Sequence, residues 1–389
     1  MRVYLDHNAT TPMAPTVRRV MQAALEGDGG NASSVHREGR EARARVDAAR
    51  MEVAALLGAE PRTVFFTSGA TESNHLGIRG LALRADSGRR RIVTTQVEHP
   101  SVRGAVDQLE SSGWEIIRIG VDADGSLDWN ELDAALTPEV AVVSVMHANN
   151  ETGVIFDVHA VAERAHAVGA RVHVDAVQTV GRLPWTVEEL GADAYSISAH
   201  KMRGPQGIGA LQVRKGVPFE PIFPGGHQER GLRPGTENLL AIVGMGAAAK
   251  LAASERQDFA DTVGPLRDSL GTMLRDRVPD MRLNGRGDRL ANTLNVAVPG
   301  CPGDALLQAM DLAGVAASSG SACTSGTVEP SHVLLAMGQV HEEAREAVRF
   351  TLARETTPHA MNRVVEVFCE SVDRIRQADV LLEDWGKVG

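Results

Sequence analysis

The sequence predicts an α/β protein with a mainly parallel sheet covered by helices on both faces, plus a smaller α+β domain. Short apolar runs alternate with helical patterns through about two-thirds of the 389 residues, and such alternation favours parallel strands joined by helical crossovers. After about residue 255 the pattern changes to a long charged helical stretch, separated strands and a final helix. That change predicts the second domain.

Five apolar runs of the first part are typical of buried strands. They lie at 63–66, 91–94, 140–145, 171–174 and 194–197, with a helix predicted over 158–167. In a parallel sheet, ligands bind beyond the carboxyl ends of the strands. The polar residues that follow these runs are therefore expected around one cleft: 68–71, His99, 149–151, Asp175 and 200–201.

The second part predicts fewer strands and longer helices. Residues 348–352 alternate apolar and polar side chains, as a half-buried strand does. Thr357 and Pro358 are typical of a helix start, as N-cap and first helical residue. The other predicted elements are helical stretches at 236–253 and 254–277 and a strand at 294–298. We expect a large domain of residues 16–255 and a small domain of residues 1–15 with 256–389.

Composition excludes several classes of partner. A hydrophobic share of 43% suits a sizeable core, while a net charge of −10 and a pI near 5.7 argue against nucleic acid or anionic membrane as partners. No apolar run has the length of a signal peptide or a membrane span. The three cysteines, Cys301, Cys323 and Cys369, fit a reducing compartment. We therefore expect a cytoplasmic protein without membrane or nucleic-acid partners.

Lys201 and Asp175 follow successive predicted strands and together indicate one cofactor. Pyridoxal phosphate needs a lysine amine for a Schiff base and an acidic partner for its pyridinium nitrogen. Either residue alone has a commoner explanation, since lysines pair or extend to the surface and carboxylates often cap helices. Their order along the sheet favours the cofactor.

A phosphate could be held where a glycine-containing turn, 68–74, enters a helix. The backbone amides of Ala70 and Thr71 and the Thr71 hydroxyl suit an anion there, although an ordinary helix cap is the alternative. Ser198 and His200 could add donors, and Ala199 would offer its backbone N–H. His99, just before a proline, could stack on a flat cofactor or serve as a structural hydrogen-bonding group.

Two further residues are candidates for substrate chemistry. Cys323 lies in a run of small residues at 316–327, where a thiol is expected to be accessible and able to act as a thiolate. Cys301 and Cys369 are expected to be buried and inert. Arg349, on the polar face of its strand, could clamp a substrate carboxylate or could simply face solvent.

Taken together, these residues resemble the cysteine desulfurases, pyridoxal-phosphate enzymes of the class V aminotransferase family. The matching segments span the chain: 5–12, 67–73, 148–153, 175–178, 200–201, 225–231 and 318–325. Segments 225–231 and 235–238 are more similar to the nitrogen-fixation branch (NifS-like) than to the housekeeping branch (IscS-like). The resemblance implies fold type I of the pyridoxal-phosphate-dependent transferases, with active sites at a dimer interface.

The resemblance also implies a role for each site residue. Lys201 forms the Schiff base and moves a proton, Asp175 holds the pyridine nitrogen and His99 stacks on the ring. Arg349 binds the substrate carboxylate, and Thr236 reaches the phosphate of a partner subunit. The implied cofactor-binding residues are Ala70, Thr71, His99, Asn150, Asp175, Gln178, Ser198, Ala199, His200, Lys201 and Thr236, with Asn150 also contacting substrate.

The implied reaction converts L-cysteine to L-alanine in a homodimer. The Cys323 thiolate attacks the substrate sulfur and keeps it as a persulfide, which an iron–sulfur scaffold protein would accept. Cys323 could then touch the cluster metal transiently during transfer.

Two departures and three alternatives accompany this resemblance. Ala199 stands where glycine is usual and Gln206 where lysine is usual, so a methyl at 199 could crowd the phosphate and weaken cofactor binding if the backbone there needs a positive φ. A selenocysteine lyase or an aminotransferase on the same fold is possible, although transamination needs no thiol. A non-catalytic assembly partner would need none of Lys201, Asp175 and Cys323.

Overall fold

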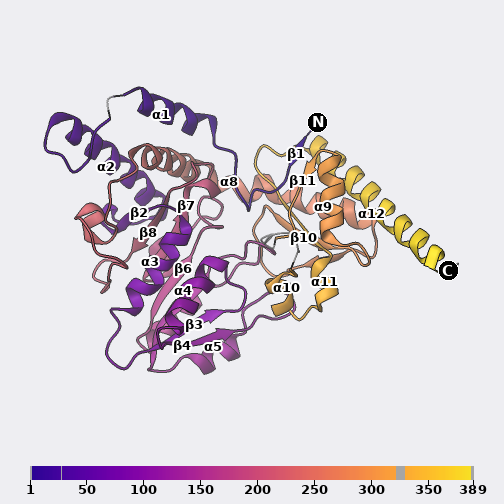
Figure 1. Cartoon of the computed structure of the whole chain (residues 1–389), viewed down its shortest axis with the longest axis horizontal. Helices are drawn as coiled ribbons and strands as arrows, with labels where there is room; N and C mark the ends of the chain where they lie inside the picture. The colour runs from indigo at the N-terminus through magenta and orange to yellow at the C-terminus, as the bar shows by residue number, and fades with distance from the viewer. Residues whose placement is uncertain (1, 28, 321–328, 387–389) are drawn as a thin grey trace.

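The large domain is built on a single seven-stranded sheet (Figure 1). The computed structural model describes residues 2–27, 29–320 and 329–386, with side chains up to residue 378. The strands are β2 (Val64–Thr67), β3 (Arg91–Thr95), β4 (Glu115–Ile119), β5 (Val140–Met146), β6 (Arg171–Asp175), β7 (Ala194–Ser198) and β8 (Gly209–Val213). Their order is β2-β8-β7-β6-β5-β3-β4, and β8 runs antiparallel to both neighbours.

All five predicted strands are present, and the mainly parallel sheet is confirmed. The sequence analysis missed β4 and β8. Both faces are buried: along β2, Phe65 joins one apolar cluster while Val64 and Phe66 join another on the opposite side. The helices of this domain are α1 (Pro15–Glu26), α2 (Arg37–Leu57), α3 (Ala70–Ala82), α4 (Pro100–Glu110), α5 (Trp129–Ala135), α6 (Val158–Ala167) and α7 (Val187–Leu190), with 3₁₀ turns at Pro61–Thr63, Ala199–Lys201 and Gln228–Gly231.

The small domain packs around a three-stranded antiparallel sheet of order β12-β10-β9. Its strands are β9 (Arg282–Asn284), β10 (Thr293–Ala297) and β12 (Ala347–Thr351), and a separate pair joins β1 (Val3–Tyr4) to β11 (Val315–Ala316). Its helices are α9 (Gly303–Leu312), α10 (His332–Ala336), α11 (His341–Arg345) and α12 (Pro358–Gly386). The predicted start of α12 is confirmed, since the Thr357 hydroxyl oxygen accepts from the Ala360 amide at 3.2 Å.

One prediction about β12 is wrong. The strand was expected to be half-buried, but all five of its residues are buried. Val348 and Phe350 enter the small-domain core, and the polar face, with Arg349 at 3% exposure, is covered by the N-terminal segment. Local alternation shows that a strand has two different faces, but it does not show what covers the polar one.

A single helix, α8 (Leu239–Arg277), replaces the two predicted helical stretches. It begins with Asn238, whose side chain accepts from the Ala241 amide at 3.2 Å, and runs from the large sheet to the small domain (Figure 1). The predicted domain boundary at residue 255 falls inside α8, so the division of the chain into 16–255 and the remainder stays a prediction.

The N-terminal segment joins the two domains through Asn8. This side chain is 2% exposed, and each of its polar atoms has a partner. Asn8 Nδ2 donates to the Asn150 carbonyl oxygen and to Thr293 Oγ1, both at 3.0 Å. Asn8 Oδ1 accepts from Arg182 at 2.7 Å and from Asn292 at 3.0 Å. Asn8 therefore links loops of the large sheet to the start of β10.

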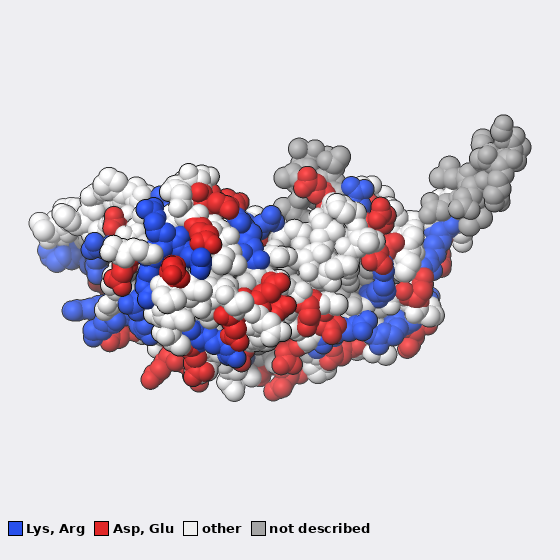
Figure 2. All heavy atoms as spheres, turned by 90° about the horizontal axis from the view of Figure 1, so that it is seen from below, with Lys and Arg blue, Asp and Glu red and all other residues white. Residues whose placement is uncertain are grey.

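The surface carries charges of both signs. On the face drawn in Figure 2, acidic and basic side chains are interspersed along the described part of the molecule, and neither sign covers it. None of the helices searched in the described residues is long and apolar enough to cross a membrane.

Replacing Asn8 should loosen the junction between the domains. We expect Asn8→Ala to lower the free energy of unfolding by roughly 2–4 kcal/mol, because it leaves buried donors and acceptors from both domains without partners. Urea unfolding followed by fluorescence would measure it. Asn31→Ala is the control, since Asn31 makes an exposed turn contact; equal effects of the two substitutions would contradict the assignment.

Candidate functional site

Nine of the sequence-predicted residues meet in one cavity of about 560 Å³ at the carboxyl ends of the large-domain strands. The convergence predicted from strand ends is thus present in the structure. The predicted residues that line the cavity are Ala70, Thr71, His99, Asn150, Asp175, Gln178, Ser198, His200 and Lys201, joined by Gln206. Thr10, Ser68 and Ser101 complete its polar wall, and Ala9, Met146, Ala148 and Val177 are apolar.

Lys201 ends the 3₁₀ turn that follows β7 and is one of only four lysines in the sequence. Its Nζ donates to the backbone oxygens of Asn8 and, at 2.7 Å, of Ala9. Burial, followed by the guanidinium groups of Arg182 and Arg349, lowers the pKa of Lys201 to about 7. A substantial fraction of this amine is therefore uncharged near neutral pH, and an amine attacks a carbonyl carbon only in that form.

Asp175 ends β6, and a buried relay connects it to His99. The fully buried Asn74 amide donates to Asp175 Oδ2 at 2.8 Å and to Ser101 Oγ at 2.9 Å. Ser101 Oγ lies 2.8 Å from His99 Nδ1, which also accepts from the Ser101 backbone N–H at 3.1 Å. Since a backbone N–H can only donate, Nδ1 is the acceptor and the neutral ring carries its proton on Nε2. The relay fixes both the carboxylate and the imidazole.

The start of α3 suits an anion. No side chain among the described residues caps this helix, and its first intrahelical bond is donated by the Ser73 amide. The preceding amides are left for a ligand, and the helix dipole favours a negative group there. Glu72 in the first turn is held by Arg233 at 2.9 Å, so much of its charge is balanced locally.

The prediction for the Ala199 backbone N–H is wrong. That N–H donates to the Ile208 carbonyl oxygen at 3.2 Å, because the chain folds back after β7 to pair with β8. The Ala199 methyl is fully buried in the core and does not line the cavity. Ala199 is also not among the described residues with positive φ. The expected crowding of the phosphate by this methyl therefore has no basis in the structure.

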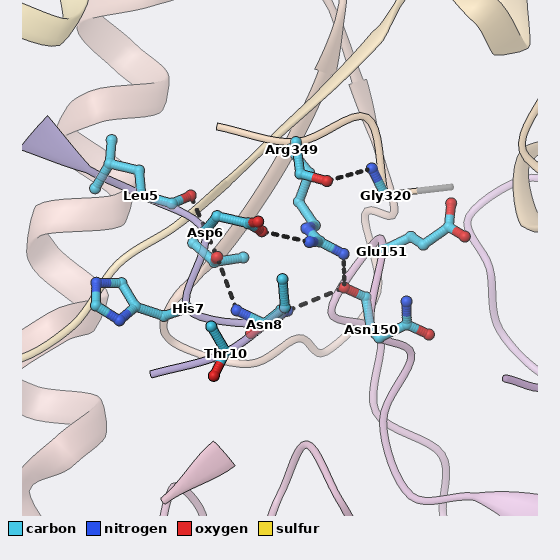
Figure 3. Close-up of polar contacts among 12 residues, drawn as sticks. Leu5, Asp6, His7, Asn8, Thr10, Asn150, Glu151, Gly320 and Arg349 are labelled. Carbon is cyan, nitrogen blue, oxygen red and sulfur yellow. Dashed lines mark hydrogen bonds and ion pairs between the residues drawn. The ribbon is translucent and has the colours of Figure 1, made fainter. Parts of the chain in front are cut away.

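Arg349 and Asp6 form an ion pair beside the cavity rather than in its wall. Arg349 Nη2 donates to Asp6 Oδ1 at 2.6 Å, and Nη1 donates to the Asn150 carbonyl oxygen at 2.9 Å (Figure 3). Asn150 itself lines the cavity. The guanidinium of Arg349 therefore lies behind the cavity wall, in contact with one of its residues. Asp6 was not predicted as a site residue, since nothing local in the sequence links it to residue 349.

Cys323 lies outside the described residues, in the gap 321–328. The chain enters this gap beside the site, because Ser318 exchanges two backbone hydrogen bonds with Arg349. Beyond the gap, the Ser331 hydroxyl donates to Glu151 Oε2. Cys301 and Cys369 are buried, as predicted. Thr236 is exposed in a smaller hollow that shares Ser68 and Gly207 with the main cavity.

The residues present fit pyridoxal phosphate. The cavity brings together a lysine with a lowered pKa, a positioned carboxylate and an open helix start. Sequence reasoning missed three residues that set this arrangement, Asn8, Asn74 and Arg182. Asn8 lies inside the segment 5–12 that resembles the desulfurases, and Asn74 ends the predicted phosphate-binding turn 68–74; these were the only available signals for them.

The comparisons with known proteins place this chain in one family. The pattern of the family described as "Aminotransferase class-V" matches residues 3–364, and the chain belongs to that family of pyridoxal-phosphate-dependent enzymes. A protein of Cereibacter sphaeroides named "Cysteine desulfurase" is 47% identical over 96% of this chain and 97% of its own. A protein of Dictyoglomus turgidum named "Cysteine desulfurase IscS" is 40% identical over 98% of each chain.

Solved structures agree. One described as "NIFS-LIKE PROTEIN" has a TM-score of 0.90 at 35% identity, covering 96% of this chain and all of its own. Another, "SspA in complex with cysteine", has a TM-score of 0.80 at 30% identity, covering 92% of this chain and all of its own.

The pKa of Lys201 gives a first prediction for the site. In cofactor-free protein, the rate of rebinding pyridoxal phosphate should rise with pH through a midpoint near 7, where Lys201 loses its proton. Stopped-flow absorbance would follow the rebinding. A midpoint near the ordinary lysine value of about 10 would show that the amine is not shifted.

Ala199 gives a second prediction. We expect Ala199→Gly to leave the dissociation constant of pyridoxal phosphate within about twofold and to cost about 1 kcal/mol of stability, because the methyl packs in the core. Equilibrium absorbance titration and urea unfolding would measure the two quantities. A several-fold gain in cofactor affinity would mean that the methyl does crowd the phosphate.

Proposed function

We propose that this chain is a cysteine desulfurase, which takes the sulfur of L-cysteine and releases L-alanine. The observation that carries the proposal is the placement of Lys201, Asp175 and the open start of α3 around one cavity. The relatives named above support the same activity. When bound, pyridoxal phosphate would supply an electron sink for the substrate carbons.

Different cavity residues would bind the phosphate, the pyridine nitrogen and the ring of the cofactor. The amides at the start of α3, with Thr71, Ser198 and His200, would hold the phosphate. Asp175, fixed by Asn74, would keep the pyridine nitrogen protonated, and His99 would cover the ring. Lys201 would hold the cofactor and then move the substrate Cα proton, a task that suits an amine with a pKa near 7.

Arg349 is the proposed partner of the substrate carboxylate. It is buried and already binds one carboxylate, that of Asp6, at 2.6 Å. A substrate carboxylate in the cavity would compete with Asp6 for the same planar donor group. Asn150, whose backbone oxygen binds Arg349 and which lines the cavity, would contact both substrate and cofactor.

Cys323 is the proposed sulfur acceptor. Its thiolate would attack the substrate sulfur, so that an S–S bond forms as the carbon–sulfur bond breaks. The carbon takes a proton to become alanine, and L-cysteine plus enzyme thiol gives L-alanine plus enzyme persulfide in balance. The residues on either side of segment 321–328 support the role of Cys323. Ser318 contacts Arg349, and Ser331 contacts Glu151.

The finer assignments are also proposals. The exposed Thr236 beside the cavity fits a homodimer in which each subunit reaches its partner's cofactor phosphate. An iron–sulfur scaffold protein is the proposed persulfide acceptor, and Cys323 would touch cluster metal only during transfer. Segments 225–231 and 235–238 favour the nitrogen-fixation branch. A cytoplasmic location rests on the sparse cysteines.

Alanine release without reductant tests the proposal. Purified protein should release about one alanine per active site and then stall, because the persulfide blocks Cys323. We expect Cys323→Ala to retain the cofactor spectrum but to lower turnover with reductant at least about a hundredfold. Mass spectrometry should find one added sulfur on wild-type protein.

Cys369→Ala is the matched control, since that thiol is buried on α12; it should behave like wild type. No alanine from cofactor-loaded protein would contradict desulfurase activity. Pyruvate with transfer of the amine would instead indicate an aminotransferase. A much higher rate with selenocysteine than with cysteine would indicate a lyase for that substrate.

A further inference from the structure

Arg182 is a buried cation in the turn after β6, bonded only to neutral oxygens in the described part of the chain. It is 5% exposed. One nitrogen, Nη1, donates to Asn8 Oδ1 at 2.7 Å and to Gln178 Oε1 at 2.8 Å. The other, Nη2, donates to the backbone oxygens of His7 at 3.0 Å and of Lys201 at 3.5 Å.

This arrangement contrasts with the other buried arginines. Arg50 is 5% exposed and binds the Glu229 carboxylate through two bonds of 2.6 and 2.7 Å, and Arg349 pairs with Asp6. Removing a cation from water without a counter-ion costs free energy. Within the described residues, no ion pair of Arg182 offsets that cost, and only hydrogen bonds to neutral oxygens do so.

The contacts of Arg182 lead directly to Lys201. Asn8 accepts Arg182 on its side chain and the Lys201 amine on its backbone oxygen. Gln178 accepts Arg182 on Oε1 and donates from Nε2 to the same Asn8 oxygen at 3.1 Å. The guanidinium therefore fixes the orientation of the Gln178 amide and the position of the segment that receives the lysine.

The charges around Lys201 come from several elements. Arg182 and Arg349 oppose a proton on the lysine, whereas Asp6 and Asp175 favour one. His99 and His200 lie close enough to feel the lysine charge. Both carboxylates have hydrogen-bonding partners, Asp6 with Arg349 and Asp175 with Asn74. Arg182, without an anion of its own, is the cation among these groups that remains uncompensated.

We propose that Arg182 is a positioning residue for Lys201: it holds the segment that receives the lysine amine, and it keeps an unmatched positive charge beside that amine. The proposal rests on the proposed role of Lys201 in carrying the cofactor. In cofactor-free protein, the Lys201 amine donates to the backbone oxygens of Asn8 and Ala9. The nearby positive charge of Arg182 would favour the uncharged form of that amine, which is the form that can bind the cofactor.

The test is the pH dependence of cofactor rebinding in variants of Arg182. In Arg182→Gln the midpoint for rebinding pyridoxal phosphate should rise by about one pH unit or more, because a neighbouring cation has been removed. Arg182→Lys keeps the charge and should stay within a few tenths of the wild-type midpoint. An unchanged midpoint in Arg182→Gln, or an equal rise in Arg182→Lys, would overturn the proposal.

A matched control separates this effect from lost stability. Arg256 also donates to backbone oxygens, those of Leu56 at 2.6 Å and Trp185 at 3.1 Å, but lies away from the cavity. Arg256→Met should leave the midpoint unchanged; a rise like that of Arg182→Gln would overturn the proposal. If Arg182→Gln does not fold, Gln178→Glu places a carboxylate against Arg182 and should raise the midpoint in the same direction, and no rise would overturn it.

Borohydride reduction of the wild-type holoenzyme and peptide mass spectrometry locate the cofactor among the four lysines. Cofactor on a lysine other than Lys201 would overturn the proposed site and this inference with it. Cofactor on Lys201, together with an unmoved midpoint in Arg182→Gln, would overturn the role of Arg182 alone.

Discussion

The structure depends on the hydrogen bonds that satisfy the buried side chain of Asn8 in the N-terminal segment. Asn8 bonds to loops of the large sheet and to the start of β10. Since a buried donor or acceptor without a partner is costly, the segment has one position in which it is stable. That position places the backbone oxygens of Asn8 and Ala9 beside Lys201. The same contacts that join the domains thereby shape the active cavity.

The cavity combines a rigid wall with balanced charge. Asn74 is fully buried and holds Asp175 and Ser101 at once, so the groups proposed for the pyridine nitrogen and the ring face are linked by one side chain. A carboxylate and an imidazole fixed in this way need little rearrangement when a flat ligand enters, which is the physical meaning of a preorganised site. Glu98, behind this wall, is completely buried, and burial raises its pKa to about 8. At neutral pH it is therefore largely uncharged and adds little negative charge to the wall.

The two buried arginines near Lys201 differ in how their positive charge is compensated. Arg349 is paired with Asp6, and this pairing leaves a carboxylate-binding group ready near Asn150. Arg182 is surrounded by neutral oxygens and so retains its field. In the proposals made above, Arg349 would exchange the Asp6 carboxylate for that of a substrate, and Arg182 would act on Lys201 through its charge.

The sequence by itself determined five of the seven strands of the sheet and the polar residues at their carboxyl ends, because a run of apolar residues and the residue that follows it are local properties. Lys201, Asp175, His99 and the start of α3 could be found in this way. Only the tertiary structure decided the rest. Asn8 and Arg182 are 174 positions apart in the chain. The Ala199 amide is bound by Ile208, directly before the unpredicted strand β8, and the polar face of β12 is covered by the N-terminal segment. Which groups meet, and which backbone donors remain free, depends on how distant segments pack, and local pattern carries no information about that.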